Sequence, residues 1–134
     1  MAGGIGIAPL RFLADVALQQ GKNITLLMGA QRAVQLLSTE LLPSKMTLAI
    51  TTNDGSMGNE GHITQLISGH ANWADQIFAS GPVSMYRYMA LKKQELKLEG
   101  KPVQLSLEVR MGCGRGVCYG CTVKTKSGLK QVCK

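Results

Sequence analysis

Cysteine is the residue type in this sequence with the most chemical potential, and all four cysteines lie toward the C-terminal end. They stand at positions 113, 118, 121 and 133, which gives the spacing C-x4-C-x2-C-x11-C. In a reducing compartment, cysteines grouped in this way bind metal more often than they form disulfides. Nothing in the sequence indicates the oxidising compartment that two disulfides would need. The pattern therefore predicts that the four side chains ligate metal; they are Cys113, Cys118, Cys121 and Cys133.

The spacing of the first three cysteines favours a two-iron two-sulfur cluster. C-x4-C-x2-C with a distant fourth cysteine is a known ligand arrangement for such clusters. Structural zinc is the alternative, but zinc modules usually present two short-spaced ligand pairs, whereas this chain has a single C-x2-C pair. His62 and His70 lie far from the cysteines in sequence, and we expect them to be surface or capping residues. A loop around a cluster must turn repeatedly, and glycines at four positions allow it to do so; they are Gly112, Gly114, Gly116 and Gly120.

A glycine-rich turn near the N-terminus is typical of a phosphate-binding loop. Gly3, Gly4 and Gly6 precede apolar residues at helical spacing, and Pro9 suits the first position of a helix. Unpaired N–H groups and the positive end of the helix would together suit a pyrophosphate; the alternative is a turn with no ligand. In this type of fold, an acidic residue after the second strand, here 23–29, is the mark of NAD binding. Gln31-Arg32 stands at that place instead, so the choice between NAD and NADP stays open.

Two further turns fall where strands are expected to end. Asp54 and Gly55 follow one strand, and Ser80, Gly81 and Pro82 follow another and begin a helix. Taken alone, the first is typical of an Asx turn and the second of a helix N-cap. Because ligands of open parallel sheets bind at the carboxyl ends of the strands, we expect both turns to join the glycine loop in one nucleotide site.

The order of apolar segments predicts an α/β fold. Strand-like and helix-like segments alternate, which implies right-handed crossovers and a parallel sheet of the Rossmann type. In such folds the glycine turn follows the first, central strand, yet two residues precede it here, so we expect that strand to be missing. The expected strands are 23–29, 46–52, 76–79 and 103–109, the expected helices are 10–21, 32–37, 62–70 and 82–100, and a small hairpin is expected over 122–132.

The net charge of +7 is unevenly distributed along the chain. Residues 1–85 contain four basic and five acidic side chains, and residues 86–134 contain eleven basic and three acidic ones, a balance of +8. A basic surface can attract nucleic acid, but the sequence has no nucleic-acid motif, so we expect no nucleic-acid partner. The alternatives are a solvated lysine-rich face, and a face that offsets an anionic cluster and docks an acidic protein partner; the second is our prediction.

Membrane insertion and export are not expected. No apolar run approaches the ~20 residues that span a bilayer, and the first residues lack the basic start of a signal peptide. The expectation is a soluble cytoplasmic protein with no membrane partner.

With these motifs in place, the chain resembles the C-terminal part of the ferredoxin reductase superfamily, and in particular the electron-transfer subunits of type B dihydroorotate dehydrogenases. The cysteine stretch is the most specific part of the resemblance. The resemblance implies a partial NAD-binding domain over residues 1–101 and a cluster-binding segment over residues 102–134. The matching stretches are GGIGIAPL (3–10), LLMGAQR (26–32), TNDGSMGNEGHIT (52–64), SGPVSMYRYM (80–89) and EVRMGCGRGVCYGCTVK (108–124).

The resemblance also implies roles for individual residues. The four cysteines would hold the cluster, Gly3, Gly4, Gly6 and the Asp54-Gly55 turn would line the nucleotide site, and Gly81-Pro82 would approach the nicotinamide. Family members usually have cysteine before Gly-Pro, where this chain has Ser80. FAD would be held mainly by an N-terminal barrel that this sequence does not contain.

The implied function is electron transfer, with no general acid or base in the chain. Electrons would pass from FMN in a dihydroorotate-oxidising partner subunit through the 2Fe-2S cluster to FAD and NAD, within a hetero-oligomer of pyrimidine biosynthesis. Pro82-Val83-Ser84-Met85 is also similar to the small subunit of an NADH-dependent ferredoxin–NADP oxidoreductase, which is a second possible identity. The sequence is compatible as well with a non-redox, zinc-stabilised nucleotide-binding module, and with a truncated gene product that has no function of its own.

Overall fold

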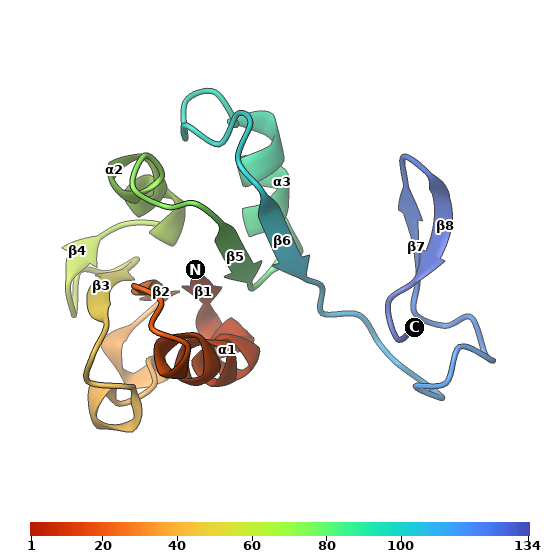
Figure 1. The fold of residues 1–134 in the computed structure, drawn as a ribbon, viewed down its shortest axis with the longest axis horizontal. Coiled ribbons are helices and arrows are strands. Elements are labelled where there is room, and N and C mark those ends of the chain that lie inside the picture. Colours follow the sequence, from red (N-terminus) through yellow and green to blue (C-terminus); the bar gives the residue numbers. More distant parts are fainter.

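The computed structural model describes all 134 residues and contains a six-stranded parallel sheet. The strands follow the order β4-β3-β2-β1-β5-β6 (Figure 1). From β1 at the centre, the chain builds out toward β4 on one side and toward β6 on the other, which confirms the predicted Rossmann-like α/β fold. The strand bounds are β1 Ala2–Gly3, β2 Thr25–Ala30, β3 Thr47–Thr52, β4 Asn59–Glu60, β5 Ile77–Ser80 and β6 Val103–Ser106.

The central strand β1 consists of two residues. Ala2 pairs with Met28 of β2 and with Ser80 of β5, and Gly3 pairs with Gly29 of β2. The sequence predicted that this strand would be missing, and the structure shows instead that its carboxyl end is present. The glycine loop therefore leaves the middle of the sheet, where the order of the strands reverses.

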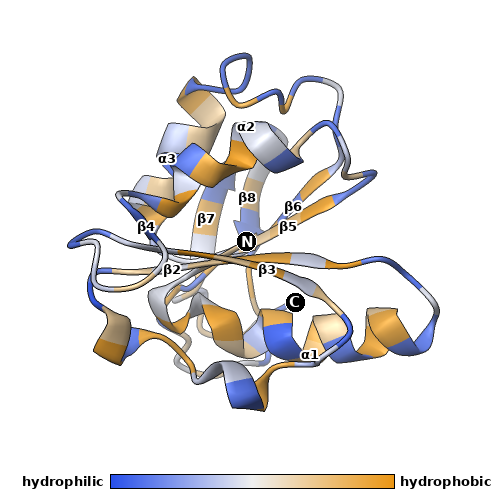
Figure 2. Cartoon of the chain, turned by 90° about the vertical axis from the view of Figure 1, so that its left-hand side faces the viewer, coloured by the Kyte–Doolittle hydropathy of each residue, from blue (hydrophilic) through white to orange (hydrophobic).

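Helices cover both faces of the sheet (Figure 2). Helix α1 (Ile7–Gln19) lies on one face, and α2 (Ile67–His70) and α3 (Val83–Leu91) lie on the other. Because successive side chains of a strand point to opposite faces, Leu26 of β2 belongs to the core under α1, whereas Leu27 belongs to the core under α2 and α3.

Helix α1 begins two residues before Pro9, which the sequence predicted at its first position. It starts at Ile7 directly after a short 3-10 helix at Gly4–Gly6, so Pro9 lies inside the first turn and not at its first position. Proline is tolerated there because the N–H groups of the first turn have no partner within the helix. Gly21, with a φ of 72°, ends the helix as predicted.

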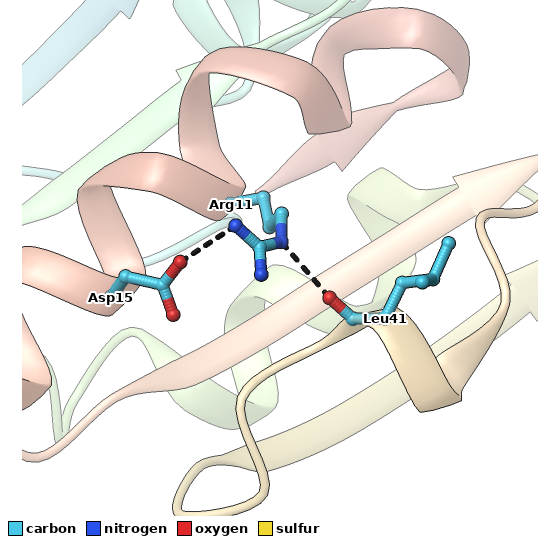
Figure 3. Close-up of polar contacts among 3 residues, drawn as sticks. All are labelled: Arg11, Asp15 and Leu41. Atoms are coloured by element: carbon cyan, nitrogen blue, oxygen red, sulfur yellow. Dashed lines mark hydrogen bonds and ion pairs between the residues drawn. The ribbon is translucent and has the colours of Figure 1, made fainter.

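Arg11 makes the polar contact between α1 and the segment that connects β2 to β3. The Arg11 guanidinium makes an ion pair with Asp15 at 2.7 Å and donates to the carbonyl oxygen of Leu41 at 2.9 Å (Figure 3). The helix predicted over 32–37 is reduced to a 3-10 turn at Ala33–Gln35, followed by a second 3-10 turn at Thr39–Leu41. Val34 in the first turn is 90% exposed, whereas Leu36 packs against the core.

The predicted long helix after Pro82 is also shorter in the structure. Helix α3 ends at Leu91, and irregular turns that include Lys97 with a φ of 57° lead on to β6. Leu96 and Leu98 are both buried. Two residues apart, they could not both face the core from one helix, whose neighbours on a face are three or four residues apart.

Strand β6 belongs to the sheet, which moves the boundary between the two parts of the chain. Residues 103–106 were assigned to the cluster-binding segment, yet they pair in register with Ile77–Ser80 of β5, and Leu107 packs against the adjoining core. We therefore propose a division after residue 107. The remaining residues form a loop and the hairpin β7 (Thr122–Thr125) and β8 (Gly128–Gln131), which stands apart from the sheet in Figure 1.

None of the helices combines the length and the apolar character that a membrane crossing requires.

Candidate functional site

The glycine loop and the Ser80-Gly81-Pro82 turn come together at the carboxyl end of the sheet. A Cβ atom on Gly6 would lie 2.2 Å from the carbonyl oxygen of Ser80, and one on Gly3 would lie 3.0 Å from Cδ of Pro82. The backbones therefore touch at a distance that allows no side chain at Gly6. Two of the three segments predicted to form the nucleotide site therefore lie in contact.

The Asp54-Gly55 turn lies at the same edge but two strands away, beyond β2. Asp54 Oδ1 accepts hydrogen bonds from the backbone N–H of Ser56 at 3.0 Å and from its hydroxyl at 2.5 Å, the geometry of an Asx turn. These bonds from Ser56 hold the pKa of Asp54 below its ordinary value. The Ser56 hydroxyl also accepts from the N–H of Ala33 at 2.8 Å, which ties this loop to the turn after β2.

Two buried threonines, which the sequence reasoning missed, shape this loop. Thr51 Oγ1 donates to the carbonyl oxygens of Asn59 and Gly61, both at 2.8 Å, and Thr52 Oγ1 bonds both backbone groups of Met57 at 3.0 Å. They fold residues 53–58 back so that β4 can pair with β3. The available signal was a pair of hydroxyl side chains at the end of an otherwise apolar strand.

Tyr86 links the Ser80-Gly81 turn to β6 and was not predicted as a site residue. Its hydroxyl accepts from the N–H of Gly81 at 2.7 Å and donates to the carbonyl oxygen of Ser106 at 2.5 Å. Burial raises the pKa of this phenol, so it stays protonated and able to donate. Beside it, the Ser80 hydroxyl is completely buried and has no hydrogen-bond partner.

The four cysteines are free thiols arranged as two neighbouring pairs. Cys113 lies with Cys118, whose backbone N–H points at Cys113 Sγ over 3.4 Å. Cys121 lies with Cys133, whose backbone N–H and thiol both face the Cys121 sulfur. A two-iron cluster needs two protein sulfurs at each iron, and two pairs match that requirement.

Backbone N–H groups favour the thiolate form, which is the form that binds metal. The N–H of Arg115, 3.3 Å from Cys113 Sγ, and then that of Cys118 lower the pKa of Cys113 to about 6. The N–H of Cys133 lowers the pKa of Cys121. The hydrogen bond with Cys121 raises the pKa of Cys133, so within that pair Cys121 ionises first.

The hairpin brings the fourth cysteine back to the loop that holds the first three. Gln131 Nε2 donates to the carbonyl oxygen of Gly116 at 3.0 Å, and Val132 N–H donates to the carbonyl oxygen of Cys121 at 3.2 Å. Gly116 has a φ of 76°, a conformation that residues with a Cβ rarely adopt. The loop can therefore turn between Cys113 and Cys118 because a glycine stands there.

In the structure, no three side chains of histidine, cysteine, aspartate or glutamate converge as they would around a single ion.

A parallel sheet with a glycine loop at its central strand, followed by a four-cysteine segment, defines a domain of the ferredoxin reductase type. Comparison with known proteins agrees with that class. Residues 108–134 match the family of the iron–sulfur cluster binding domain of dihydroorotate dehydrogenase B. The match begins directly after the division proposed at residue 107.

The most similar relatives are more specific than the fold class. The chain is 36% identical to the dihydroorotate dehydrogenase B (NAD(+)) electron transfer subunit of Geobacillus thermodenitrificans, over 99% of this chain and 51% of that protein. It is also 36% identical to the homologous subunit of Aquifex aeolicus, with the same coverage. The resemblance to this group of electron-transfer subunits is thereby confirmed.

A solved structure is similar over the same extent. It is an NADH-dependent reduced ferredoxin–NADP oxidoreductase, described in the context of flavin-based electron bifurcation, with a TM-score of 0.83 and 30% identity. The similarity covers 98% of this chain and 48% of that one. The chain thus spans about half the length of the relatives it matches.

Proposed function

We propose that this chain is part of an electron-transfer subunit that relays electrons from a dihydroorotate-oxidising flavoprotein to FAD and NAD in pyrimidine biosynthesis. The observation that carries the proposal is the pairing of the four thiols within a segment that matches the cluster-binding domain of dihydroorotate dehydrogenase B. When bound, a 2Fe-2S cluster supplies one-electron transfer. Cys113, Cys118, Cys121 and Cys133 would be its ligands.

The cysteine segment would contribute more than its four sulfurs. Backbone N–H groups of Arg115 and Cys118 point at Cys113, and the N–H of Gly120 points at Cys118 over 3.4 Å. Such bonds stabilise the negative charge on ligating sulfurs and help to set the reduction potential of a cluster.

The carboxyl edge of the sheet would bind NAD. Gly3, Gly4 and Gly6 would approach the pyrophosphate at the start of α1, and Ser80, Gly81 and Pro82 would form the wall beside them. Asp54 and Gly55 would lie farther along the same edge. Support comes from the contact between the Gly6 and Ser80 backbones and from the position of the loop at the reversal of strand order.

A protein partner is part of the proposal. It is the FMN-containing catalytic subunit, within a hetero-oligomer, because the similar proteins are electron transfer subunits of dihydroorotate dehydrogenase B. We place the protein in the cytoplasm because its four free thiols suit a reducing compartment.

A second candidate function has an observation of its own. The NADH-dependent ferredoxin–NADP oxidoreductase matches 98% of the chain with a TM-score of 0.83. In that case the electron partner would be a ferredoxin. The two candidates share the cluster and the nucleotide edge and differ in the partner.

Anaerobic metal analysis tests the shared part. The purified chain should contain iron and acid-labile sulfide in equal amounts, about two of each per chain, and should show the low-temperature EPR signal of a reduced 2Fe-2S cluster. A colourless chain containing one zinc and no sulfide would establish the zinc-stabilised module instead.

Electron transfer to the cluster then separates the two partners. The chain is mixed anaerobically with the catalytic subunit of a dihydroorotate dehydrogenase B and with dihydroorotate, or with a reduced ferredoxin. If the cluster absorbance is bleached by dihydroorotate with the catalytic subunit, and not by reduced ferredoxin, the first function is supported. Bleaching by reduced ferredoxin, and not by dihydroorotate with the catalytic subunit, supports the second. Bleaching that did not require the catalytic subunit would contradict the proposed relay.

A further inference from the structure

Gln131 is the residue through which the hairpin contacts the loop that contains Cys113 and Cys118. Its side-chain Nε2 donates to the carbonyl oxygen of Gly116 at 3.0 Å. No other hydrogen bond in the structure connects the loop over 111–118 to the hairpin over 122–131. The bond is partly buried, which strengthens it relative to a bond in open water. The loop is therefore joined to the hairpin by one side chain that is not itself a thiol.

Gly116, which accepts this bond, lies between the two thiol pairs. Its φ of 76° places it in the left-handed region, and a Cβ atom added to it would lie 3.3 Å from Gln131 Oε1. The Gln131 amide thus packs directly on the glycine. The N–H of Gly116 faces the Cys133 sulfur, while its carbonyl oxygen accepts from Gln131. A shift of this one residue would be felt at both pairs.

The carbonyl group of Gly116 and the N–H of Val117 belong to the same peptide group. This peptide group is trans and planar, so its C=O and N–H point in opposite directions. Gln131 holds the oxygen on one side. On the other side the N–H of Val117 faces the Cys113 sulfur, together with two further backbone N–H groups of the loop. A rotation of this peptide group would turn the N–H away from the sulfur.

An N–H group directed at a ligating sulfur favours additional negative charge there. One-electron reduction of a 2Fe-2S cluster adds such a charge, and hydrogen bonds to the sulfurs are among the factors that set its potential. A side chain that keeps the N–H in place therefore raises the potential. Donation to the carbonyl oxygen acts in the same direction, because it polarises the peptide group and strengthens the bond that the N–H makes.

From this contact and this peptide geometry, we propose that Gln131 is a positioning residue for the cluster site. It fixes the peptide group between Gly116 and Val117, keeps the N–H directed at the Cys113 sulfur, and thereby raises the reduction potential. This role rests on the proposed function, since it requires a 2Fe-2S cluster at the four cysteines, and it adds a residue outside the ligand set that controls how readily the site accepts an electron.

The role is measured by redox titration of the anaerobically purified chain, followed by the EPR signal of the reduced cluster. Gln131→Met keeps the length of the side chain and removes its donor. The variant should retain about two iron atoms per chain, because all four thiols remain. Its equilibrium constant for reduction should fall at least threefold, which corresponds to about 28 mV for a one-electron couple.

A second variant and a control separate the hydrogen bond from other effects. Gln131→Glu has the same shape, but its carboxylate cannot donate to the carbonyl oxygen of Gly116. Its potential should fall at least as far as that of Gln131→Met, since the added negative charge acts in the same direction. Leu129→Met is the control, because Leu129 lies on the same strand β8 and is 73% exposed. It should titrate like the parent.

Iron and acid-labile sulfide analysis of the parent chain separates failure of this role from failure of the proposed function. A parent chain without iron and sulfide would refute both. If the parent contains the cluster, an unchanged potential in Gln131→Met would overturn the role of Gln131 alone, and so would an equal fall in Leu129→Met. A fall confined to Gln131→Glu would show that only the added charge matters. Loss of iron from Gln131→Met would show that the contact folds the loop and does not set the potential, and would overturn the role as well.

Discussion

Gly6 carries a packing constraint that can be tested with one methyl group. An added Cβ would lie 2.2 Å from the carbonyl oxygen of Ser80 and 2.7 Å from the N–H nitrogen of Gly81, so the backbone would have to move. We expect Gly6→Ala to destabilise the chain by about 1–3 kcal/mol, the usual cost of overpacking, and to weaken NAD binding. Urea unfolding and NAD titration measure the two effects.

Gly69 provides the matched control for that substitution. It lies in α2, and a Cβ there would meet nothing within 4 Å. Gly69→Ala should leave NAD affinity unchanged and stabilise the chain slightly, since alanine favours helix over glycine by about 1 kcal/mol. Equal losses in the two variants would show that the contact between Gly6 and Ser80 has no special importance.

The cysteines make a second prediction at the scale of single residues. A 2Fe-2S cluster brings about two iron atoms per chain. Cys113→Ser should reduce the bound iron well below that number, because it removes one of the two sulfurs of a pair. Val117→Ser lies in the same loop, is 72% exposed in the parent and should keep its iron. Iron and acid-labile sulfide analysis after anaerobic purification gives the result. Full iron in Cys113→Ser would exclude that residue as a ligand.

At the scale of the elements, Tyr86 connects the Ser80-Gly81 turn to β6, the strand that leads to the cysteines. Tyr86→Phe leaves the buried N–H of Gly81 and the carbonyl oxygen of Ser106 without their partner. The expected loss is about 1–3 kcal/mol in the free energy of unfolding. Tyr88→Phe in the same helix is the control, because the Tyr88 side chain is 39% exposed and makes no hydrogen bond within the chain. Similar stability of the two variants would contradict the role of Tyr86.

The observed strands and helices show which elements the sequence patterns predicted correctly. The strands at Thr25–Ala30, Thr47–Thr52 and Ile77–Ser80 were predicted within two residues, because strands buried on both faces are short apolar runs between turns. Helix α3 was predicted about nine residues too long. The residues around Leu91 contain no signal for a helix end, and the apolar residues that follow reach the core through irregular turns.

The candidate site was predictable for a similar reason. Cysteine spacing and glycine turns are local signals, and they identified residues that the structure brings into pairs or into contact. Thr51, Thr52 and Tyr86 were missed because their partners lie 5 to 20 residues away along the chain. Such contacts follow from the register of the whole sheet and leave little trace in the residues themselves.

The charge distribution makes the last prediction, which concerns docking. Residues 86–134 carry eleven basic and three acidic side chains, and an oxidised 2Fe-2S cluster with four thiolates adds about −2, so this part of the molecule stays basic. Affinity for an acidic face of the catalytic subunit should therefore fall at least tenfold between about 0.05 and 0.5 M salt, as the screening length shortens. The double variant Lys124→Gln and Lys130→Gln, with both positions exposed on the hairpin, should bind more weakly and with a smaller salt dependence. Lys45→Gln, exposed before β3, should leave both quantities unchanged. Affinity that did not vary with salt, measured by titration calorimetry, would show that charge does not direct this docking.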